Sequence, residues 1–532
     1  MLRNRSFYIF FIIIALVVSC AKRGNITGGD KDIDPPVMIG SSPENLSTDF
    51  KGNLIKIYFD EYVKLKDVQK QLIVSPPMKR APEISPMGNA SRYVTIKILD
   101  TLQPNTTYSF NFGQSIIDNN EGNPYQQFKY IFSTGSEIDS LSLTGTIKNA
   151  YTKDVESFVS VMLYEVNDKL TDSIVYKETP RYITNTLDSL KVFKLENLKE
   201  GKYLLVAMKD KNNNYKFDPK TDKIAFSNEY ITIPHEGEVE LKLFQEKLPF
   251  KAFKPVQSSG NRLIMGYEGD YKKSTITVKN GKDILPNIIT QFPEKDSVQI
   301  WYPSVKTDSL HINIAKDDYS KDFAIKIKDQ KKDTLSITAI QSGVLNFRDK
   351  LSLKSTTPLV KFDQSKIKLI NKDSTAVAYK MEYDTINQQL SFDFPKEPSN
   401  KYTLSLLPGA LTDFFQKAND SLKFAVTTLN TTEFGNLKIT LENVKSFPVI
   451  VELTNIKGDV QASYYSEKET VIDFINIKPD LFTLRVIYDT NHNKVWDTGN
   501  YLEKRQPEEV IYFPKDVDVR ANWDVDQVFR LP

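Results

Sequence analysis

The chain is dominated by short segments in which apolar and polar residues alternate. Residues 54–59 and 94–99 are two examples, and in each of them every second side chain is apolar. A period of two places the apolar side chains on one face of an extended strand, whereas an amphipathic helix needs a period of about 3.6 residues. Because long stretches with the helical period are scarce, the pattern predicts an all-β chain.

The strands fall into groups separated by turns rich in Pro, Asn, Asp and Gly. A chain of 532 residues is too long for one core, since a domain typically holds about 100 to 200 residues. We therefore predict five β-sandwich domains in tandem. Their ranges are 35–136, 140–246, 247–344, 345–430 and 433–532.

The first twenty residues differ from the rest of the chain. Arg3 and Arg5 precede an almost unbroken apolar stretch over residues 7–18, and Cys20 follows it. About a dozen apolar residues are too few for a membrane-spanning helix, which needs roughly 20. The pattern predicts a cleavable signal peptide over residues 1–19, and a permanent transmembrane span is the weaker alternative.

The end of this leader, residues 17–20, resembles a bacterial lipobox, in which the cysteine is acylated and becomes the first residue of the mature chain. Cys20 is also the only cysteine of the sequence, which excludes a disulfide. The resemblance implies lipidation at Cys20, and each acyl CH₂ that enters a bilayer contributes about 0.8 kcal/mol to anchoring. Residues 20–34, rich in Gly, Asp, Lys and Pro, are then a flexible tether.

The first predicted sandwich carries a set of short motifs. They are Pro35-Pro36, Ser42-Pro43-Glu44, Ile57-Tyr58-Phe59-Asp60-Glu61, Leu102-Gln103-Pro104-Asn105-Thr106-Thr107-Tyr108, Asp118 with Gly122-Asn123, and Phe132-Ser133-Thr134. Together they resemble the bacterial Ig-like domain of surface-layer proteins. With Cys20 in front of them, the chain also resembles Bacteroidetes lipoproteins. This resemblance implies an Ig-like sandwich outside the cytoplasm and implies no reaction.

Two internal repeats extend the fold prediction. Residues 197–210 parallel residues 476–489, so 140–246 and 433–532 are predicted to be two copies of one module. Upstream of the first copy, residues 143–150 and 159–164 resemble a transthyretin-like or carboxypeptidase-regulatory-like sandwich. A looser pairing of residues 402–428 with 108–134 predicts a degenerate second Ig-like domain over 345–430, while 247–344 is a sandwich of unassigned type.

The two copies of the repeated module both run into an Asn-rich loop with the same spacing of polar residues. Relative positions 1, 3, 5 and 9 are Asp210, Asn212, Asn214 and Asp218 in the first loop, and Asp489, Asn491, Asn493 and Asp497 in the second. Oxygen ligands on alternate residues of a tight loop are what Ca²⁺ requires. The spacing therefore predicts a candidate Ca²⁺ site in each loop.

Two features distinguish these loops from an EF-hand. Position 6 is Tyr215 or Lys494 instead of Gly, and position 12 lacks the closing Glu, so a further ligand must come from Asp222, Glu503 or elsewhere. The alternative interpretation is structural, because Asp and Asn favour tight turns by hydrogen-bonding to their own backbone. The sequence leaves both interpretations open.

Other chemistry finds little support. The three histidines, His235, His311 and His492, lie far apart and have no metal-ligand spacing, and no Gly-rich phosphate loop or nucleophile elbow is present. The net charge of +2 provides no field for attracting nucleic acid. Trp301-Tyr302 could stack on a sugar, but an aromatic pair in a strand more often belongs to a core. No catalytic residue is predicted, and the chain is expected not to be an enzyme.

These observations favour a non-catalytic cell-envelope lipoprotein, a rod of five sandwiches anchored in the outer membrane through Cys20 and facing the periplasm or the cell surface. Such a protein acts as a structural or interaction scaffold, with Ca²⁺ at the two loops as a stiffener, and its partner is an envelope protein or a glycan. The alternative is a carbohydrate-binding or carbohydrate-active surface lipoprotein. A concave cleft lined by aromatic side chains and two carboxyl groups would distinguish the alternative from a scaffold.

Overall fold

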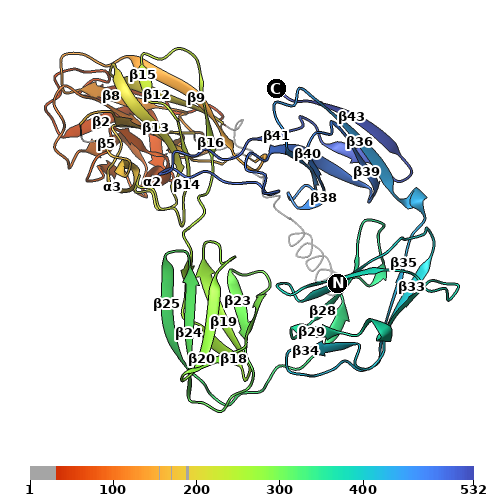
Figure 1. The fold of residues 1–532 in the computed structure, drawn as a ribbon. Coiled ribbons are helices and arrows are strands. Elements are labelled where there is room, and N and C mark those ends of the chain that lie inside the picture. Colours follow the sequence, from red (N-terminus) through yellow and green to blue (C-terminus); the bar gives the residue numbers. More distant parts are fainter. Residues whose placement is uncertain (1–31, 155, 169, 187–190) are drawn as a thin grey trace, which may run out of the picture. The chain divides into compact units, whose positions relative to one another are not determined.

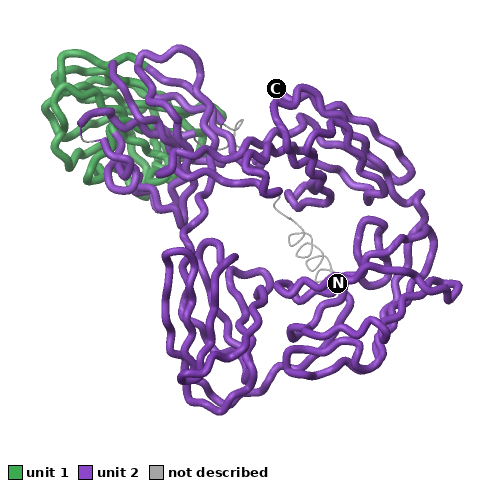
Figure 2. The backbone as a smooth tube through the Cα atoms, in the orientation of Figure 1, with its two compact units in different colours: residues 1–141, 181–183, 196–199 green, residues 142–180, 184–195, 200–532 purple. Residues whose placement is uncertain are grey.

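The computed structural model describes residues 32–154, 156–168, 170–186 and 191–532. The predicted signal peptide, Cys20 and most of the predicted tether lie outside the described residues. Helices in the described part of the chain are short, and none has the length and apolar character needed to cross a membrane. The chain divides into two compact units. Residues 1–141, 181–183 and 196–199 form unit 1, which is green in Figure 2, and the remaining residues form unit 2, which is purple.

The first sandwich is built from two sheets. Its elements are β1 (Met38–Ser42), β2 (Leu54–Leu65), α2 (Val68–Gln71), β3 (Ile73–Ser75), β4 (Glu83–Ser85), β5 (Ser91–Lys97), β6 (Thr107–Asn111), β7 (Ile116–Asp118) and β8 (Lys129–Ser133). One sheet has the order β1-β2-β5-β4 with β7 beside β2, and the other has the order β3-β6-β8. Ile57 and Val94 face each other across β2 and β5, and both are buried, as alternation predicts.

The second sandwich follows with a different strand order. Its elements are β9 (Leu141–Asn149), β10 (Ser160–Glu165), α3 (Ile174–Lys177), β11 (Tyr182–Asn185), β12 (Val192–Leu198), β13 (Gly201–Lys209), β14 (Lys223–Phe226), β15 (Ile231–Ile233) and β16 (Val239–Leu243). The sheets are β12-β9-β16 and β11-β10-β13-β14, with β15 beside β13. Strands β10 and β13 are buried along almost their whole length, so both faces of their sheet are covered. Strands buried on two faces carry continuous apolar runs instead of alternation.

The third sandwich, green in Figure 1, has its own topology. Its strands are β17 (Lys251–Ala252), β18 (Val256–Ser259), β19 (Arg262–Glu268), β20 (Thr275–Asn280), β21 (Asp283–Leu285), β22 (Ile288–Gln291), β23 (Ser297–Trp301), β24 (Ser309–Lys316) and β25 (Tyr319–Lys326). They form the sheets β17-β19-β23-β22, with β18 beside β19, and β21-β20-β24-β25. Leu263, Ile300 and Ile312 belong to the core between them.

The fourth sandwich begins earlier than the sequence pattern suggests. Its elements are β26 (Ile337–Ala339), β27 (Gly343–Val344), β28 (Leu351–Ser355), β29 (Leu359–Phe362), η1 (Gln364–Lys366), β30 (Ile367–Ile370), β31 (Lys380–Asp384), β32 (Gln389–Asp393), β33 (Lys401–Leu406), β34 (Leu411–Asp413) and β35 (Leu422–Thr427). Strand β26 pairs with β28, and β27 pairs with β35. The strand pairing therefore starts this sandwich at β26, and residues 337–344 belong to it instead of the third sandwich.

The fifth sandwich is the last along this sequence. Its elements are η2 (Thr431–Glu433), β36 (Gly435–Glu442), β37 (Val449–Thr454), β38 (Val460–Ser466), β39 (Val471–Ile477), β40 (Asp480–Tyr488), β41 (Val510–Tyr512), β42 (Val517–Val519) and β43 (Asp524–Arg530). The sheets are β39-β36-β43 and β38-β37-β40-β41, with β42 beside β40. Ile439, Val451 and Leu484 lie in the core between the two sheets.

The strand orders reproduce both repeats seen in the sequence. The second and fifth sandwiches have the same pairings, including a parallel pair between the first and last strands, β9 with β16 and β36 with β43. The first and fourth sandwiches also share one topology, with two differences. The long β2 corresponds to two strands, β28 and β29, and the strand β27, which pairs with β35, corresponds to a single bridge between Ser47 and Phe132. Pro358 lies between β28 and β29, and a proline cannot donate to a ladder. The prediction of an all-β chain of tandem sandwiches is confirmed.

Candidate functional site

The first repeated loop, after β13, is organised by two buried carboxylates. Asp210 Oδ1 accepts a hydrogen bond from the backbone N–H of Asn212 at 2.9 Å, and Oδ2 accepts one from the N–H of Tyr215 at 2.7 Å. Asp222 Oδ1 accepts from the N–H of Lys211, and its Oδ2 from the N–H of Asp218. Burial raises the pKa of Asp210, and the nearby carboxylate of Asp222 raises it further.

The second loop, after β40, repeats this arrangement. Asp489 Oδ1 accepts from the backbone N–H of Asn493 at 3.1 Å, and Oδ2 from the N–H of Lys494 at 2.8 Å. Glu508 takes the place of Asp222, because its Oε2 accepts from the N–H of Asp497 at 3.0 Å and its Oε1 from that of Thr490.

Asp497 differs from its counterpart in the first loop, Asp218. Its carboxylate accepts hydrogen bonds from the side-chain amides of Asn491 and Asn493 and from Lys247 Nζ. Burial opposes ionisation of Asp497, but these three donors outweigh it and lower the pKa of the carboxyl group. In the first loop, Asp218 instead accepts a bond from the backbone N–H of Lys220, two residues ahead.

The two loops share one backbone conformation. Positions 4 and 6 are left-handed in both, with φ of 53° and 57° at Asn213 and Tyr215, and of 61° and 67° at His492 and Lys494. The turn that an EF-hand makes with Gly is therefore made here by other residues. Of the two residues named from the sequence as sources of a further ligand, Asp222 hydrogen-bonds within the first loop, whereas the Glu503 carboxylate pairs with Arg505. Glu508 takes the corresponding place in the second loop.

The candidate ligands thus lie together in each loop, where most of their oxygens accept bonds from loop amides. Asn214 Oδ1 accepts from the N–H of Lys216, and Asn493 Oδ1 from that of Val495. Within the described residues, no three or more His, Cys, Asp or Glu side chains converge in a metal-binding group. These bonds are those of Asx turns, and Ca²⁺ binding stays a prediction.

The second loop contains a segment that the first lacks. Strand β14 begins at Lys223, thirteen residues after Asp210, whereas β41 begins at Val510, twenty-one residues after Asp489. We call residues 498–505 the hook. Tyr501 of the hook is 0% exposed, and its ring lies 5.3 Å from that of Phe226 and 6.2 Å from that of Tyr176. Both neighbours belong to the second sandwich, so the hook joins two sandwiches within unit 2.

Polar contacts hold the base of the hook. The backbone N–H of Tyr501 donates to Glu246 Oε1 at 2.6 Å, and Thr498 Oγ1 donates to the carbonyl of Gln245 at 2.6 Å. Gly499 packs so closely that a Cβ there would lie 2.6 Å from the ring of Phe244. Only glycine fits this approach.

In a second aromatic contact, a residue of the second sandwich packs against the fifth. Tyr151, just after β9 of the second sandwich, packs its ring 4.2 Å from the guanidinium group of Arg485 and 4.5 Å from the ring of Trp496. Arg485 Nη2 donates to the Tyr151 hydroxyl at 2.6 Å, and the Tyr512 hydroxyl donates to the Tyr151 carbonyl at 2.6 Å. We call the hook contacts and the Tyr151 contacts together the clasp. Within unit 2, the clasp therefore brings the second sandwich into contact with the fifth, which is not its neighbour along the chain.

The clasp depends on differences between the two copies. Arg485 of β40 pairs across the sheet with Glu452, and the two side chains form an ion pair of 2.7 Å. At the same place in the second sandwich, Val206 pairs with Met162, and both are buried. The sequence comparison missed the hook and Arg485 because it followed similarity alone. The extra loop length and the charged residue in an otherwise apolar strand were the available signals.

The Trp301-Tyr302 pair and the three histidines differ in burial. Trp301 and Tyr302 are 0% and 1% exposed, so they belong to the core and do not form a sugar-stacking surface. The Trp301 indole N–H donates to Thr290 Oγ1 at 2.8 Å. His235, His311 and His492 are all exposed.

The fold and these contacts define a class of protein with tandem β-sandwich domains, two of which are Ig-like by strand order. Residues 32–134 match the family model described as the bacterial Ig-like domain, Big_5, which confirms the Ig-like prediction for the first sandwich. No curated protein is significantly similar to the chain.

Solved structures with tandem domains resemble the chain. The crystal structure of the S-layer protein rSbsC(31-844) is 12% identical and covers 91% of this chain and 67% of its own, with a TM-score of 0.15. The crystal structure of domains A168-A170 from titin is 12% identical and covers 45% of this chain and 91% of its own, with a TM-score of 0.15.

Proposed function

We propose that this protein is a non-catalytic lipoprotein of the bacterial cell envelope that acts as a structural or interaction scaffold. The observation that carries the proposal is the clasp. It uses aromatic and charged side chains to join sandwiches that are distant in sequence. Contacts of this kind hold two domains in a fixed arrangement and do not form a reaction site. The bacterial Ig-like domain at residues 32–134 supports the same assignment.

The anchor proposed for this scaffold is a lipid on Cys20 that holds it at the outer membrane, facing the periplasm or the cell surface. The test is metabolic labelling of the full chain with an alkyne-bearing palmitate in a bacterial host, followed by membrane fractionation. Wild type should carry the label and sediment with membranes, and Cys20→Ser should do neither. Because Cys20 is the only cysteine, label in the Cys20→Ser chain would contradict thioester or thioether lipidation at this site.

Ca²⁺ binding at the two repeated loops is part of the proposal as a stiffener. Asp210 and Asp218 supply carboxylates in one loop, and Asp489 and Asp497 supply them in the other. Oxygen donors of this kind fit Ca²⁺, and two carboxylates per loop are typical of the weak sites of extracellular modules, with a Kd of about 10⁻⁴ to 10⁻³ M.

A carbohydrate-binding role is the second candidate. The observation that favours it is a pocket beside the fourth sandwich, lined by Phe347 and Phe394 together with polar side chains. This pocket has one carboxylate, Asp393, whereas glycoside hydrolysis ordinarily uses a pair. A hydrolytic role would be supported by release of reducing ends from envelope polysaccharides that Asp393→Asn abolishes.

A further inference from the structure

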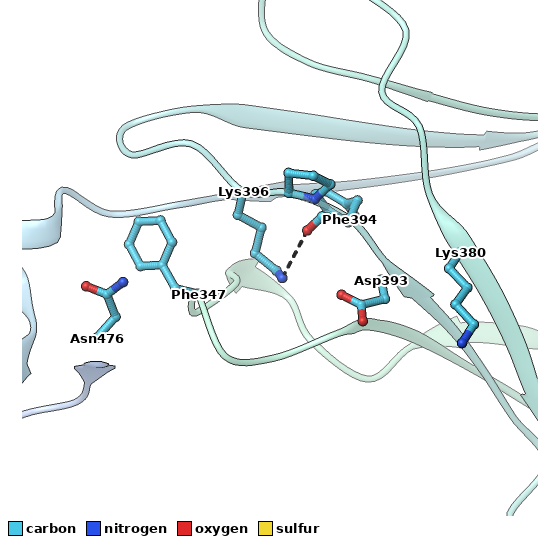
Figure 3. A pocket seen from close by; sticks show the side chains of 7 residues that line it. Phe347, Lys380, Asp393, Phe394, Lys396 and Asn476 are labelled. Atoms are coloured by element: carbon cyan, nitrogen blue, oxygen red, sulfur yellow. Dashed lines mark hydrogen bonds between the residues drawn. The ribbon is translucent and has the colours of Figure 1, made fainter. Parts of the chain in front are cut away.

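A pocket of about 530 Å³ lies at one edge of the fourth sandwich, close to the fifth. Its lining residues are Phe347, Lys380, Asp393, Phe394, Pro395, Lys396 and Asn476. Figure 3 shows the ring of Phe347 and the side chain of Lys396 on one side of this space, with Asp393 and Lys380 farther along it. The volume falls within the range of about 300 to 1,000 Å³ that is usual for small-molecule sites.

Lys396 is half-buried and forms no ion pair with any described residue. Its Nζ donates a hydrogen bond to the carbonyl of Phe394 at 3.3 Å and lies 5.2 Å from the centre of the Phe394 ring. Burial lowers the pKa of Lys396, although Asp393 and Asp349 oppose this shift. Removing a charge from water without pairing it is unfavourable. An anion in the pocket would offset that cost.

The residues beside Phe347 in the sequence also carry polar groups. Arg348 is exposed, and its guanidinium group donates a hydrogen bond of 3.4 Å to the carbonyl of Ile475 and lies 5.6 Å from the centre of the Phe474 ring. The side-chain oxygen of Asn346 is buried and accepts no hydrogen bond. Unpaired buried polar groups are uncommon in folded proteins, and a missing water, ion or ligand is one of their explanations.

The walls of the pocket add a requirement for shape. Phe347 and Phe394 supply apolar rings, while Asp393 and Asn476 supply hydrogen-bonding groups at the edges. The charged lining residues, Lys380, Lys396 and Asp393, leave one net positive charge. We propose that this pocket binds a small carboxylate whose ring offers an apolar face, of about the size of one hexuronic acid, with the carboxylate on Lys396 and the ring against Phe347. This inference does not depend on the scaffold role.

The test is calorimetric titration of the full chain with D-glucuronate, and with D-glucose and cyclohexanecarboxylate as comparison probes. Each probe is used at roughly 10 mM, which fills most of any site with a Kd near 1 mM. Glucuronate should bind wild type and glucose should not. Binding should weaken at least tenfold in Lys396→Met and recover in part in Lys396→Arg. Lys354→Met, which removes an exposed lysine of the same sandwich, should bind as wild type does.

Comparison of the two carboxylate probes shows which kind of ring acid the pocket prefers. Tighter binding of glucuronate indicates an acidic sugar, and tighter binding of cyclohexanecarboxylate indicates a less polar ring acid, and either result supports the site. Equal binding of glucose and glucuronate, failure of both carboxylates to bind, or full binding by a folded Lys396→Met chain would overturn the proposal. Near-ultraviolet circular dichroism establishes that each variant is folded before titration.

Discussion

The clasp makes a sharp prediction for Tyr501, because its ring and its hydroxyl group have opposite roles. The ring is completely buried against Phe226 and Tyr176 of the second sandwich. The hydroxyl is buried too, but it has no hydrogen-bond partner. Tyr501 is absent from the apolar core of the fifth sandwich, so its replacement should leave that sandwich folded.

The expected magnitudes follow from these two facts. Truncating a buried aromatic side chain to alanine costs about 3–5 kcal/mol. Applied to the contact between the two sandwiches, Tyr501→Ala should reduce the equilibrium constant for clasp closure by roughly 10² to 4 × 10³, since 1.4 kcal/mol corresponds to tenfold. Tyr501→Phe keeps the ring and removes a buried unpaired hydroxyl, whose desolvation costs about 1–3 kcal/mol. The phenylalanine variant should therefore hold the clasp at least as tightly as wild type.

The distance between the two sandwiches can be measured by pulsed electron spin resonance. Nitroxides would be attached at Thr232→Cys and Asp526→Cys, both exposed strand positions, in a chain that carries Cys20→Ser. Wild type and Tyr501→Phe should give one narrow distance distribution, and Tyr501→Ala a broad one that extends to longer distances. A narrow distribution for Tyr501→Ala, or an equally broad one for Tyr501→Phe, would refute the reasoning.

Four further predictions follow from other parts of the structure. Gly499→Ala should broaden the same distance distribution, because its Cβ would lie 2.6 Å from the ring of Phe244, and an unchanged distribution would contradict this close approach. Arg485→Val alone should loosen the clasp and leave the carboxylate of Glu452 without its ion-pair partner, which should lower the free energy of unfolding by about 3–5 kcal/mol. Arg485→Val combined with Glu452→Met copies the second sandwich and should recover part of that free energy. Asp118→Asn should destabilise the first sandwich by about 2–3 kcal/mol at pH 7, because its buried carboxylate accepts four backbone N–H bonds. Burial opposes ionisation of Asp118, but these bonds lower its pKa. Their contribution to stability is therefore present above the unfolded pKa of about 3.9 and is lost as the pH falls through the folded pKa. An acid unfolding midpoint that is the same in wild type and in Asp118→Asn would contradict this prediction. Ca²⁺ at roughly 100 times the Kd should stabilise each repeated loop by about 2.7 kcal/mol, and Asp210→Ala with Asp489→Ala should remove the shift; a shift that persists in this variant would place the ion elsewhere.

The two repeats show how much of the fold can be predicted from local sequence patterns. The match between residues 197–210 and 476–489 predicts two copies of one module, and the structure gives both the same strand order. Tyr108 and Tyr402, which the looser repeat aligns, each accept a bond from the backbone N–H five residues earlier, of Gln103 and of Glu397. Such features are readable because strand alternation and turn chemistry act over a few residues.

The candidate site was predictable only in part. The Asp and Asn spacing identifies both loops and Asp222, since hydrogen bonds within a loop depend on short sequence distances. Glu508 was missed because it follows the hook, which lengthens the second loop and moves the closing carboxylate away from its expected position. The start of the fourth sandwich was misplaced for a similar reason, as β26 and β27 have strand-like sequence but only pairing decides which sheet they join.

The sequence by itself determined the all-β class, the Ig-like first sandwich, the two repeats and the position of the paired loops. Each of these depends on periodicity, turn residues or similarity between short segments of the sequence. The tertiary structure alone decided that Tyr501 lies against Phe226, that Arg485 contacts Tyr151, and that Lys396 is half-buried without an ion pair. Those contacts join residues that are tens to hundreds of positions apart, or depend on which atoms exclude water, and no local pattern encodes either property.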